Sequence, residues 1–362
     1  MASPSKYPLH DRRKDLKLLS VDFNAVHQAV SSVDIIVAVL EKFITEHGPK
    51  QDLEEALIQA RYPNGLPYYQ HWVSIDAVAR HHGLSVGNFV HMIDLSSPYF
   101  LQTGAWDVDA GRALAHASRL GPYQRKLLTE PPAAIVDRDD FYLKNFGAEG
   151  LAWQNLNQVP FFGERTKLDT PGIEALLSVR GFAPVRSANV TYAGAAPVDP
   201  ESERSGSVYL NANVAPAVSI TSTGDGPSFL HRLSVSPTTA EGLARYDRMN
   251  RKVRLDNWLE LPSDQVDALL VAAIRAEVRG GADEDAWWIS DNVVHALGLF
   301  QSLRERYGCT AQDFAAFIDE MSVYGRGETL SQFDQVFNNR GDYSQPLKLD
   351  DQPFPVLPVE GD

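Results

Sequence analysis

The 362-residue sequence contains a single cysteine, Cys309, and it has no long apolar run. A lone thiol excludes intrachain disulfides and multi-cysteine zinc or iron–sulfur sites within one chain. The apolar run at residues 35–40 is closed by Asp34 and Glu41 and is far shorter than the ~18 residues of a membrane helix. The first residues also lack the apolar segment and cleavage site of a secretory signal peptide. We therefore expect no bilayer-spanning helix, and any export would use another route.

Positive charge is scarce as well. The chain has 33 Lys and Arg residues against 47 Asp and Glu residues, which gives a formal net charge of −14. Nucleic acids and anionic membrane surfaces are negative, so this balance argues against both as main partners. Hydrophobic residues make up 44% of the chain, enough for a packed core, and the length allows two or three domains of ~150 residues each.

Catalytic motifs are missing. The sequence has no HExxH, P-loop, G-x-S-x-G or dinucleotide-binding fingerprint. His81, His82 and His91 lack the i, i+4 spacing that places two imidazoles on one helix face as metal ligands. The acidic cluster at residues 283–285 lacks the ligand spacing of a calcium-binding loop. The sequence therefore predicts no enzymatic activity, no cofactor and no metal site.

Four single residues have both a functional and a structural interpretation. Trp287 and Trp288 could stack on a sugar, although an aromatic pair beside a helix is more often a packing anchor. His295 lies beside an apolar helical stripe, where a core or boundary histidine is the commoner case. Cys309 would need a neighbouring cation or base to act as a nucleophile, and we expect it to pack in a turn.

The most informative stretch is residues 238–274, which predicts two successive amphipathic helices. The second helix carries a broad apolar stripe formed by Val266, Leu269, Leu270, Ala273 and Ile274. The first carries a narrower stripe formed by Leu243, Tyr246, Met249 and Val253. We expect both stripes to face a core, and we expect the Ser263 hydroxyl to cap the second helix.

The first of these helices is basic, since it carries Arg245, Arg248, Arg251, Lys252 and Arg254. Such a row could clamp phosphate or carboxylate groups of a partner. Asp247 and Asp256 lie in the same helix, however, and alternating charges along a helix face typically form solvated or interhelical salt bridges. We therefore expect a solvated structural face. On this interpretation, truncating Arg251 costs far less stability than truncating the core residue Leu269.

Helical periodicity recurs along most of the chain, often after a one- or two-residue turn and a hydroxyl cap, as in αα-hairpins. The predicted caps are Ser85, Ser290 or Asp291, and Thr310. Helices are expected at residues 33–44, 52–60, 72–80, 86–93, 114–128, 140–147, 171–179, 291–307 and 311–321.

Residues 184–237 differ from the rest, because they are rich in Ser, Thr, Val, Gly and Pro. Candidate strands lie at residues 207–210, 217–220 and 230–235. The expected fold class is mainly α, a multi-helix bundle of αα-hairpins with a small β insertion. The expected division is an N-terminal helical domain at residues 1–183, a β-rich insertion at 184–237, a second helical part at 238–340 and an extended tail at 341–362.

Short motifs are distributed over residues 11–340. They are DRRKDLKLL, VDIIVAVLEKFI, RYPNGLPYY, LGPYQRKLLTEP, FYLKNFG, RYDRMNRKVRL and YGRGETLSQFDQVFNN. Together they resemble the N-terminal helical region of the A component of the insecticidal toxin complexes (Tc toxins), which those proteins share with the plasmid-encoded virulence protein A family. The last motif is the most specific, because it is similar to the family's PSQFDRLFN signature. Val37 and Ala38 depart from the family's opening motif, which often has Asn and Glu there.

The resemblance implies a helical shell that surrounds a toxin-translocation channel in a homopentamer. It also implies contact with other toxin-complex subunits, binding to a host cell-surface receptor, and release or surface display after synthesis in the bacterial cytoplasm. Larger family members carry an inserted β domain implicated in receptor binding where this chain has the shorter residues 184–237. The family's channel and its B-component-binding end have no counterpart in this sequence.

The resemblance assigns structural rather than catalytic roles to its motif residues, namely Arg248, Asn250, Arg251, Ser331, Gln332, Phe333, Asp334, Phe337 and Asn338. Two classes of function remain open. One is a non-enzymatic segment of a Tc toxin A component, and the other is a free-standing virulence or interaction protein with the same helical domain. The neighbouring genes would discriminate between them, because adjacent B- and C-component genes favour the first.

Overall fold

The computed structural model describes residues 32–48, 52–93, 118–190, 206–212, 216–223, 230–281, 287–326, 328–339 and 346–349. The chain divides into two compact units, residues 1–56 and residues 57–362. Several expectations fall outside the described residues. These are the opening motif at 11–19, the first residues of the helix expected at 114–128, the acidic cluster at 283–285 and most of the expected tail.

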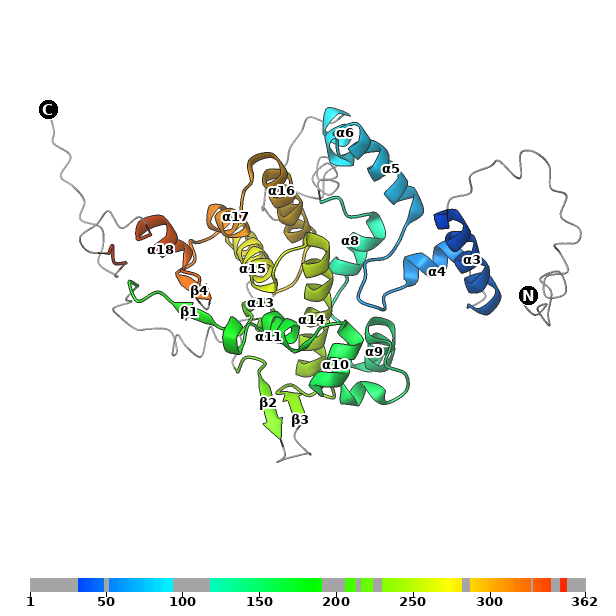
Figure 1. Cartoon of the computed structure of the whole chain (residues 1–362), viewed down its shortest axis with the longest axis horizontal. Coiled ribbons are helices and arrows are strands. Elements are labelled where there is room, and N and C mark those ends of the chain that lie inside the picture. Colours follow the sequence, from blue (N-terminus) through cyan, green and yellow to red (C-terminus); the bar gives the residue numbers. More distant parts are fainter. Residues whose placement is uncertain are drawn as a thin grey trace, which may run out of the picture. The chain divides into compact units, whose positions relative to one another are not determined.

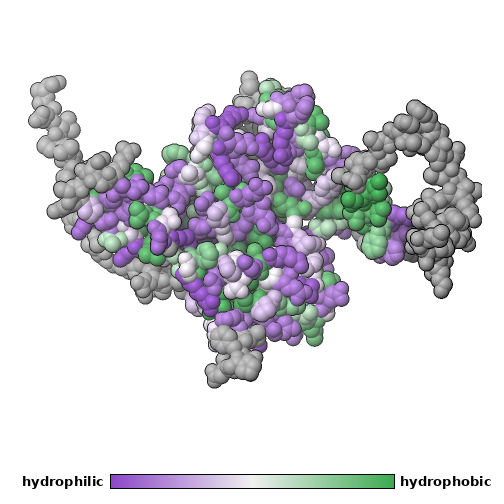
Figure 2. Space-filling model, viewed as in Figure 1, coloured by the Kyte–Doolittle hydropathy of each residue, from purple (hydrophilic) through white to green (hydrophobic). Residues whose placement is uncertain are grey.

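The first unit contains α3 (Ser32–His47), which confirms the helix expected at residues 33–44. Its apolar side chains are not buried within that unit. Ile36, Leu40 and Phe43 are each more than half exposed, and Figure 2 shows the hydrophobic surface over this helix. The next helix, α4 (Leu53–Gln59), begins at the end of the first unit.

The second unit is mainly helical (Figure 1), as the periodicity predicts. Its α-helices are α5 (Gln70–His81), α6 (Val86–Ile93), α8 (Pro122–Thr129), α9 (Arg138–Phe146), α10 (Val159–Thr166), α11 (Thr170–Leu177), α13 (Val208–Asn211), α14 (Ala240–Leu259), α15 (Ser263–Arg279), α16 (Asp291–Tyr307), α17 (Ala311–Ile318) and α18 (Gln332–Phe337). Three short 3₁₀ helices are η2 (Ile135–Asp137), η3 (Ala152–Asn155) and η4 (Arg180–Phe182). The mainly α fold class is therefore confirmed.

The described strands form two antiparallel pairs. β2 (Ile220–Thr223) pairs with β3 (Leu230–Leu233), which confirms the strand expected at 230–235. The strand expected at 217–220 lies three residues nearer the C-terminus than predicted. β1 (Pro184–Arg186) pairs with β4 (Tyr324–Arg326), far along the chain. This second pair was not predicted, and it ties the start of the expected insertion to the C-terminal helical part.

The strand expected at residues 207–210 is wrong, because that segment forms α13. The Ser207 hydroxyl accepts a hydrogen bond from the Leu210 amide at 3.1 Å. The Asp267 carboxylate of α15 accepts bonds from the Val208 and Tyr209 amides at 3.1 and 3.3 Å. These acceptors satisfy the free amides of a helix N-terminus, so tertiary contacts override the β propensity of the sequence.

The core is built around α14 and α15, as the two apolar stripes predict. Every residue of both stripes is at most 4% exposed, including Tyr246, Leu269 and Ile274. α15 packs against α14 and α16 and most extensively against α17 (Figure 1). Both helices therefore lie at the centre of the second unit and not at its surface.

The predicted helix caps are confirmed except one. Ser290 and Thr310 accept hydrogen bonds from Val293 and Asp313 amides, at 3.2 and 3.1 Å, and begin α16 and α17. The cap predicted at Ser263 is wrong, since Pro262 precedes α15 without a side-chain cap. The Ser263 hydroxyl instead donates to the Asp256 carboxylate of α14 at 2.5 Å. The hydroxyl is thus engaged by a partly buried carboxylate and not by an amide of α15.

The described part of the expected tail is anchored. The Leu349 amide donates to the Asn189 carbonyl at 2.9 Å, and the Leu347 amide donates to Asn338 Oδ1 at 2.7 Å. Residues 346–349 thus differ from the loosely held extension expected there.

Candidate functional site

The basic row on α14 is buried, so the expectation of a solvated face is wrong. Arg245, Arg251, Lys252 and Arg254 are 4%, 3%, 0% and 1% exposed. Burying a charge without partners is costly, so each of these side chains requires compensating contacts. We call Asn64, Asn145, Asp247, Asn250, Arg251, Lys252, Arg254 and Asp256 the basic cluster.

Arg251 closes the end of another helix. Its Nη1 donates to the Leu127 and Leu128 carbonyls at 3.0 and 2.6 Å, which belong to the last turn of α8. Its Nε donates to Asp247 Oδ1, one helical turn earlier, at 2.9 Å. The guanidinium also lies 4.1 Å from the ring centroid of Trp288, a cation–π contact. The side chain therefore satisfies carbonyls that a helix C-terminus leaves free.

Arg254 joins α14 to the loop after α4. Its Nη2 donates to the Arg61 carbonyl at 2.6 Å, and its Nη1 donates to the Gly65 carbonyl. Its Nε donates to Asn250 Oδ1 at 2.8 Å. Burial, together with the nearby Arg61 and Arg251 charges, lowers the pKa of Arg254 to about 9, although the Glu130 and Asp247 carboxylates oppose this shift. The loop is thus held by charge-assisted bonds to its backbone.

Asn250 extends the same contacts through its amide. Its Nδ2 donates to Asn64 Oδ1 at 2.7 Å and to the Asn145 carbonyl at 3.2 Å. Asn64 in turn donates to the Arg165 carbonyl, the end of α10, at 3.1 Å. One polar side chain on α14 therefore connects segments from three other parts of the second unit.

Lys252 links α14 to α15. Its Nζ donates to the Ser263 carbonyl at 2.6 Å and lies 3.5 Å from Asp256 Oδ1. Burial raises the pKa of the Asp256 carboxyl, while the Lys252 charge and the Ser263 hydroxyl oppose that shift. The turn between the two helices is consequently fixed by a buried ion pair and not by a side-chain cap.

The chemistry of the basic cluster is structural. Its donors point to backbone carbonyl, side-chain amide, hydroxyl or carboxylate oxygens of the same chain, which is not the arrangement of a site that clamps a ligand. One feature of the sequence indicated that these side chains bond to one another along α14. Asp247 and Arg251, Asn250 and Arg254, and Lys252 and Asp256 are partners at i, i+4 spacing, which pairs them along the helix.

Arg248 and the two tryptophans adjoin the cluster. Arg248 Nε donates to the Trp287 carbonyl at 3.4 Å, and burial lowers the pKa of Arg248. Trp288 Nε1 donates to the Glu130 carbonyl at 3.0 Å. Trp287 packs against the main core. The packing interpretation of this aromatic pair therefore fits the contacts observed.

The second group of motif residues forms the start of α18. The Ser331 hydroxyl accepts from the Asp334 amide at 3.1 Å and donates to the Asp334 carboxylate at 2.8 Å. Asn189 and Asn338 donate to the same carboxylate at 2.9 and 2.8 Å. Burial raises the pKa of Asp334, but hydrogen bonds from Ser187, Asn189, Asn338 and Ser331 outweigh it and lower the pKa to about 2.

The two motif groups are not brought together. Phe333 belongs to a small hydrophobic cluster with Val190 and Val323, whereas the residues of α14 belong to the main core. The Phe337 ring packs at a tilt against the Phe333 ring with centroids 5.3 Å apart, and Gln332 Nε2 donates to Asp313 Oδ1 at 3.3 Å. Each group organises its own part of the second unit.

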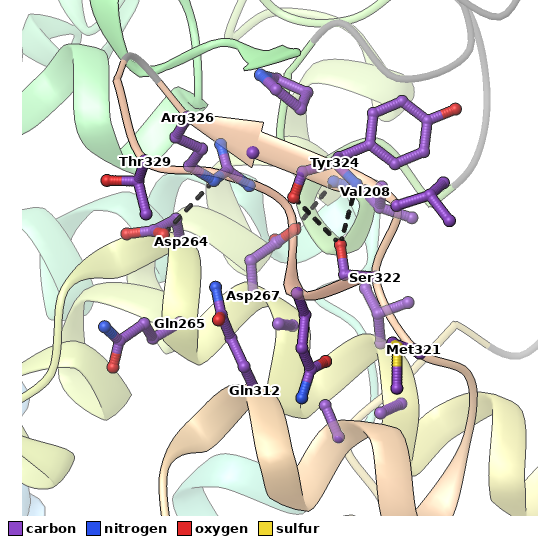
Figure 3. Close-up of a pocket in the computed structure, with 18 of the residues that line it drawn as sticks. Val208, Asp264, Gln265, Asp267, Gln312, Met321, Ser322, Tyr324, Arg326 and Thr329 are labelled. Atoms are coloured by element: carbon purple, nitrogen blue, oxygen red, sulfur yellow. Dashed lines mark hydrogen bonds and ion pairs between the residues drawn. The ribbon is translucent and has the colours of Figure 1, made fainter. Parts of the chain in front are cut away.

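A pocket of about 490 Å³ lies between α15, α17 and the segment that leads into β4 (Figure 3). Asp264 and Gln265 line it from α15, and Gln312 lines it from α17. Arg326 of β4 lies across the pocket and pairs with Asp264 at 3.3 Å. No pattern in the sequence predicted this pocket, because its lining comes from segments far apart in the chain.

Three features of the described ranges concern metal binding, the reactivity of the single thiol and the length of apolar helices. No cluster of three or more His, Cys, Asp or Glu side chains there could hold a metal ion. Burial and the Asp313 carboxylate raise the pKa of the Cys309 thiol, which makes it a poorer nucleophile at neutral pH. Across the same part of the chain, no helix is both long and apolar enough to cross a membrane.

Comparison with known proteins agrees with the motifs. Residues 2–169 match the family model described as the Salmonella virulence plasmid 28.1kDa A protein. The toxin subunit YenA1 of Yersinia entomophaga is 31% identical over 234 residues, which is 62% of this chain. The chain is related to the A components of the Tc toxins.

A solved structure supports the same fold. The cryo-EM structure of Morganella morganii TcdA4 matches 92% of this chain with a TM-score of 0.53 at 13% sequence identity. The relatives are much longer, because the chain spans 19% of YenA1 and 17% of TcdA4. The chain thus corresponds to about a fifth of a Tc toxin A-type protein, in its helical region.

Proposed function

We propose that this chain is a non-enzymatic segment of a Tc toxin A component, where it forms part of the helical shell around a toxin-translocation channel. In this role it contributes to assembly or to host-surface binding through packing and surface contact. The similarity to toxin subunits supports the proposal. The basic cluster supports it too, since its polar groups join segments of this chain and do not face a substrate.

The observation that carries the proposal is the apolar surface of α3. Ile36, Leu40 and Phe43 are 57%, 53% and 59% exposed, and Ile35, Val37 and Val39 beside them are also exposed. Soluble monomers rarely leave a contiguous apolar patch of this kind uncovered. We therefore propose that α3 packs against another subunit, as expected for the homopentamer of the family.

Sedimentation velocity tests this role for α3. The purified chain should self-associate in a concentration-dependent way, and the variant Ile36→Glu with Leu40→Glu should sediment as a monomer. The matched control is Val136→Glu, because Val136 is 86% exposed in η2 and lies outside the patch. A wild-type chain that remains monomeric at all concentrations and binds no other toxin-complex subunit would refute the proposal.

The remaining parts of the proposal concern activity and location. We propose that the chain has no hydrolase or transferase activity and that it is released or displayed at the cell surface. Liposome leakage provides a direct check, because the purified chain alone should not release an entrapped dye. Efficient leakage would show that the chain acts on membranes by itself.

A second candidate is a free-standing virulence or interaction protein with the same helical domain. It is favoured by the match of residues 2–169 to a virulence-plasmid A protein described as 28.1kDa, which is smaller than this 40.0 kDa chain. Pull-down with separately expressed B and C components distinguishes the two candidates. Binding to them supports the toxin-complex segment, whereas a host protein as the sole partner supports the second candidate.

A further inference from the structure

The pocket between α15, α17 and β4 has a lining suited to a ligand with an aliphatic stem. Small apolar side chains from two helices form its floor, and Figure 3 shows the polar groups around them. Ala268, Val271 and Ala272 of α15 and Ala315 of α17 form this floor, and Met321 and Val323, which follow α17, extend it. Other apolar residues that line the pocket are Phe182, Pro184, Val208, Pro262 and Leu330. A stem of methylene groups would bury its surface against this floor.

The charges of the lining favour a cation. Four carboxylates line the pocket, those of Asp264, Asp267, Asp319 and Glu320, against two guanidinium groups. Arg326 pairs with Asp264 at 3.3 Å, and both Arg275 and Arg279 pair with Asp319. The Asp267 carboxylate accepts hydrogen bonds from Ser207, Val208 and Tyr209, so three of the four carboxylates are engaged within the chain. Glu320 is exposed at the rim, and within the described residues no ion pair engages its carboxylate. It is therefore the acidic group best placed to receive a basic ligand.

Two amide side chains add a second recognition element. Gln265 of α15 and Gln312 of α17 both line the pocket, and neither is joined by a hydrogen bond to the other residues drawn in Figure 3. A glutamine amide offers both donors and an acceptor, which matches the donor and acceptor of a peptide group. A volume of about 490 Å³ is within the range of ligand pockets and leaves room for backbone beside one basic side chain.

We propose that this pocket binds a short segment of a protein partner through a lysine or arginine side chain. The alkyl stem lies on the apolar floor, the cation meets Glu320, and the flanking peptide groups pair with Gln265 and Gln312. Charge complementarity of this kind sets specificity for the partner. The binding does not depend on the proposed role of the chain in a toxin complex.

Fluorescence anisotropy with labelled hexapeptides tests the proposal on the full chain. Three peptides differ only at two central positions, which carry two arginines, two glutamates or two leucines. The arginine peptide should bind at least about tenfold more tightly than the other two, and its affinity should fall as salt increases. Failure of the arginine peptide to bind, or equal binding of all three, would overturn the proposal.

Variants locate the site. Glu320→Lys should lower the affinity for the arginine peptide about tenfold. The control Glu328→Lys makes the same charge change at an exposed residue that does not line the pocket, so it should change the affinity less than about twofold. Gln265→Leu should also weaken binding without changing net charge. Equal effects of the two lysine variants would show that the peptide is attracted non-specifically. Complete displacement of the peptide by equimolar spermidine would show that the ligand is a free amine and not a peptide.

Discussion

Helices α14 and α15 follow one another along the chain, with only Glu260, Leu261 and Pro262 between them, and both lie in the main core. α15 is buried by alkyl groups such as those of Leu269 and Leu270. α14 is buried although it carries five basic residues, and for Arg251, Lys252 and Arg254 carbonyl, amide or carboxylate oxygens lie at bonding distance. Burial of a helix in this protein thus follows from satisfied partners as well as from apolar surface.

The difference matters for what each helix does. Apolar packing tolerates substitution by another apolar side chain of similar volume, because that side chain fills the same space. The hydrogen bonds of Arg251 and Arg254 require particular carbonyls at particular positions. We infer that α15 provides stability, and that α14 fixes which loop and which helix end lie beside it.

The largest loss of unfolding free energy is expected for Arg251→Ala. This substitution removes the donor to two α8 carbonyls, and it leaves the buried Asp247 carboxylate with the Ala133 amide as a remaining partner. Breaking a buried ion pair from one side costs about 3–5 kcal/mol. We expect a loss of that size in urea unfolding monitored by circular dichroism. This reverses the expectation from the sequence, and a loss below about 1 kcal/mol would restore the solvated interpretation.

Leu269→Ala should have a comparable or slightly smaller effect. Leu269 is fully buried in the stripe of α15, and such truncations cost about 2–5 kcal/mol through lost burial and a residual cavity. Leu269→Met is the matched control, because it conserves volume and should cost less than about 1.5 kcal/mol. If both substitutions had the same unfolding midpoint, the apolar description of α15 would fail.

A smaller, pH-dependent effect is expected for Lys252→Met, which removes the charge beside Asp256. At pH 7 the loss should be about 1–3 kcal/mol, because the Asp256 carboxylate retains the Ser263 hydroxyl but loses its cation. The sign of the pH dependence follows from the raised pKa of Asp256. Its folded pKa lies above the unfolded value, so the stability it contributes is present at low pH and is lost as the pH rises through the folded pKa.

The variant should raise that pKa further, because Lys252 opposes the shift. We therefore expect the difference in unfolding free energy between wild type and Lys252→Met to grow from pH 4 to pH 7. A difference independent of pH would show that Asp256 is not held in the buried environment described.

The sequence predicted the helices that contribute apolar side chains to the core. Periodicity identified α14, α15 and α16, and cap chemistry placed Ser290 and Thr310, because both signals are local. It did not predict the burial of Arg254, whose partners Arg61 and Gly65 lie 193 and 189 residues earlier in the chain. It also misassigned α13, since the carboxylate that begins this helix belongs to Asp267 of another helix.

The pocket could not be predicted for the same reason. Gln265, Gln312 and Arg326 meet there only after α15, α17 and β4 have packed. The resemblance to toxin proteins assigned structural roles to Arg251 and Asp334. It did not show that these two residues lie in separate clusters. Only the folded arrangement distinguishes a charged motif residue that bonds to a helix end from one that faces a ligand.

A double-mutant cycle on Asp247 and Arg251 tests the burial of the basic cluster most directly, with Asp247→Asn and Arg251→Met made singly and together. The exposed pair Asp140 and Lys144 has the same i, i+4 spacing, with N–O distances of 2.7 Å there and 2.9 Å in the buried pair, and serves as the matched control. We predict a coupling free energy above about 1.5 kcal/mol for the buried pair and about 0.3–0.5 kcal/mol for the exposed pair. Equal coupling in the two pairs would contradict the central role assigned to α14.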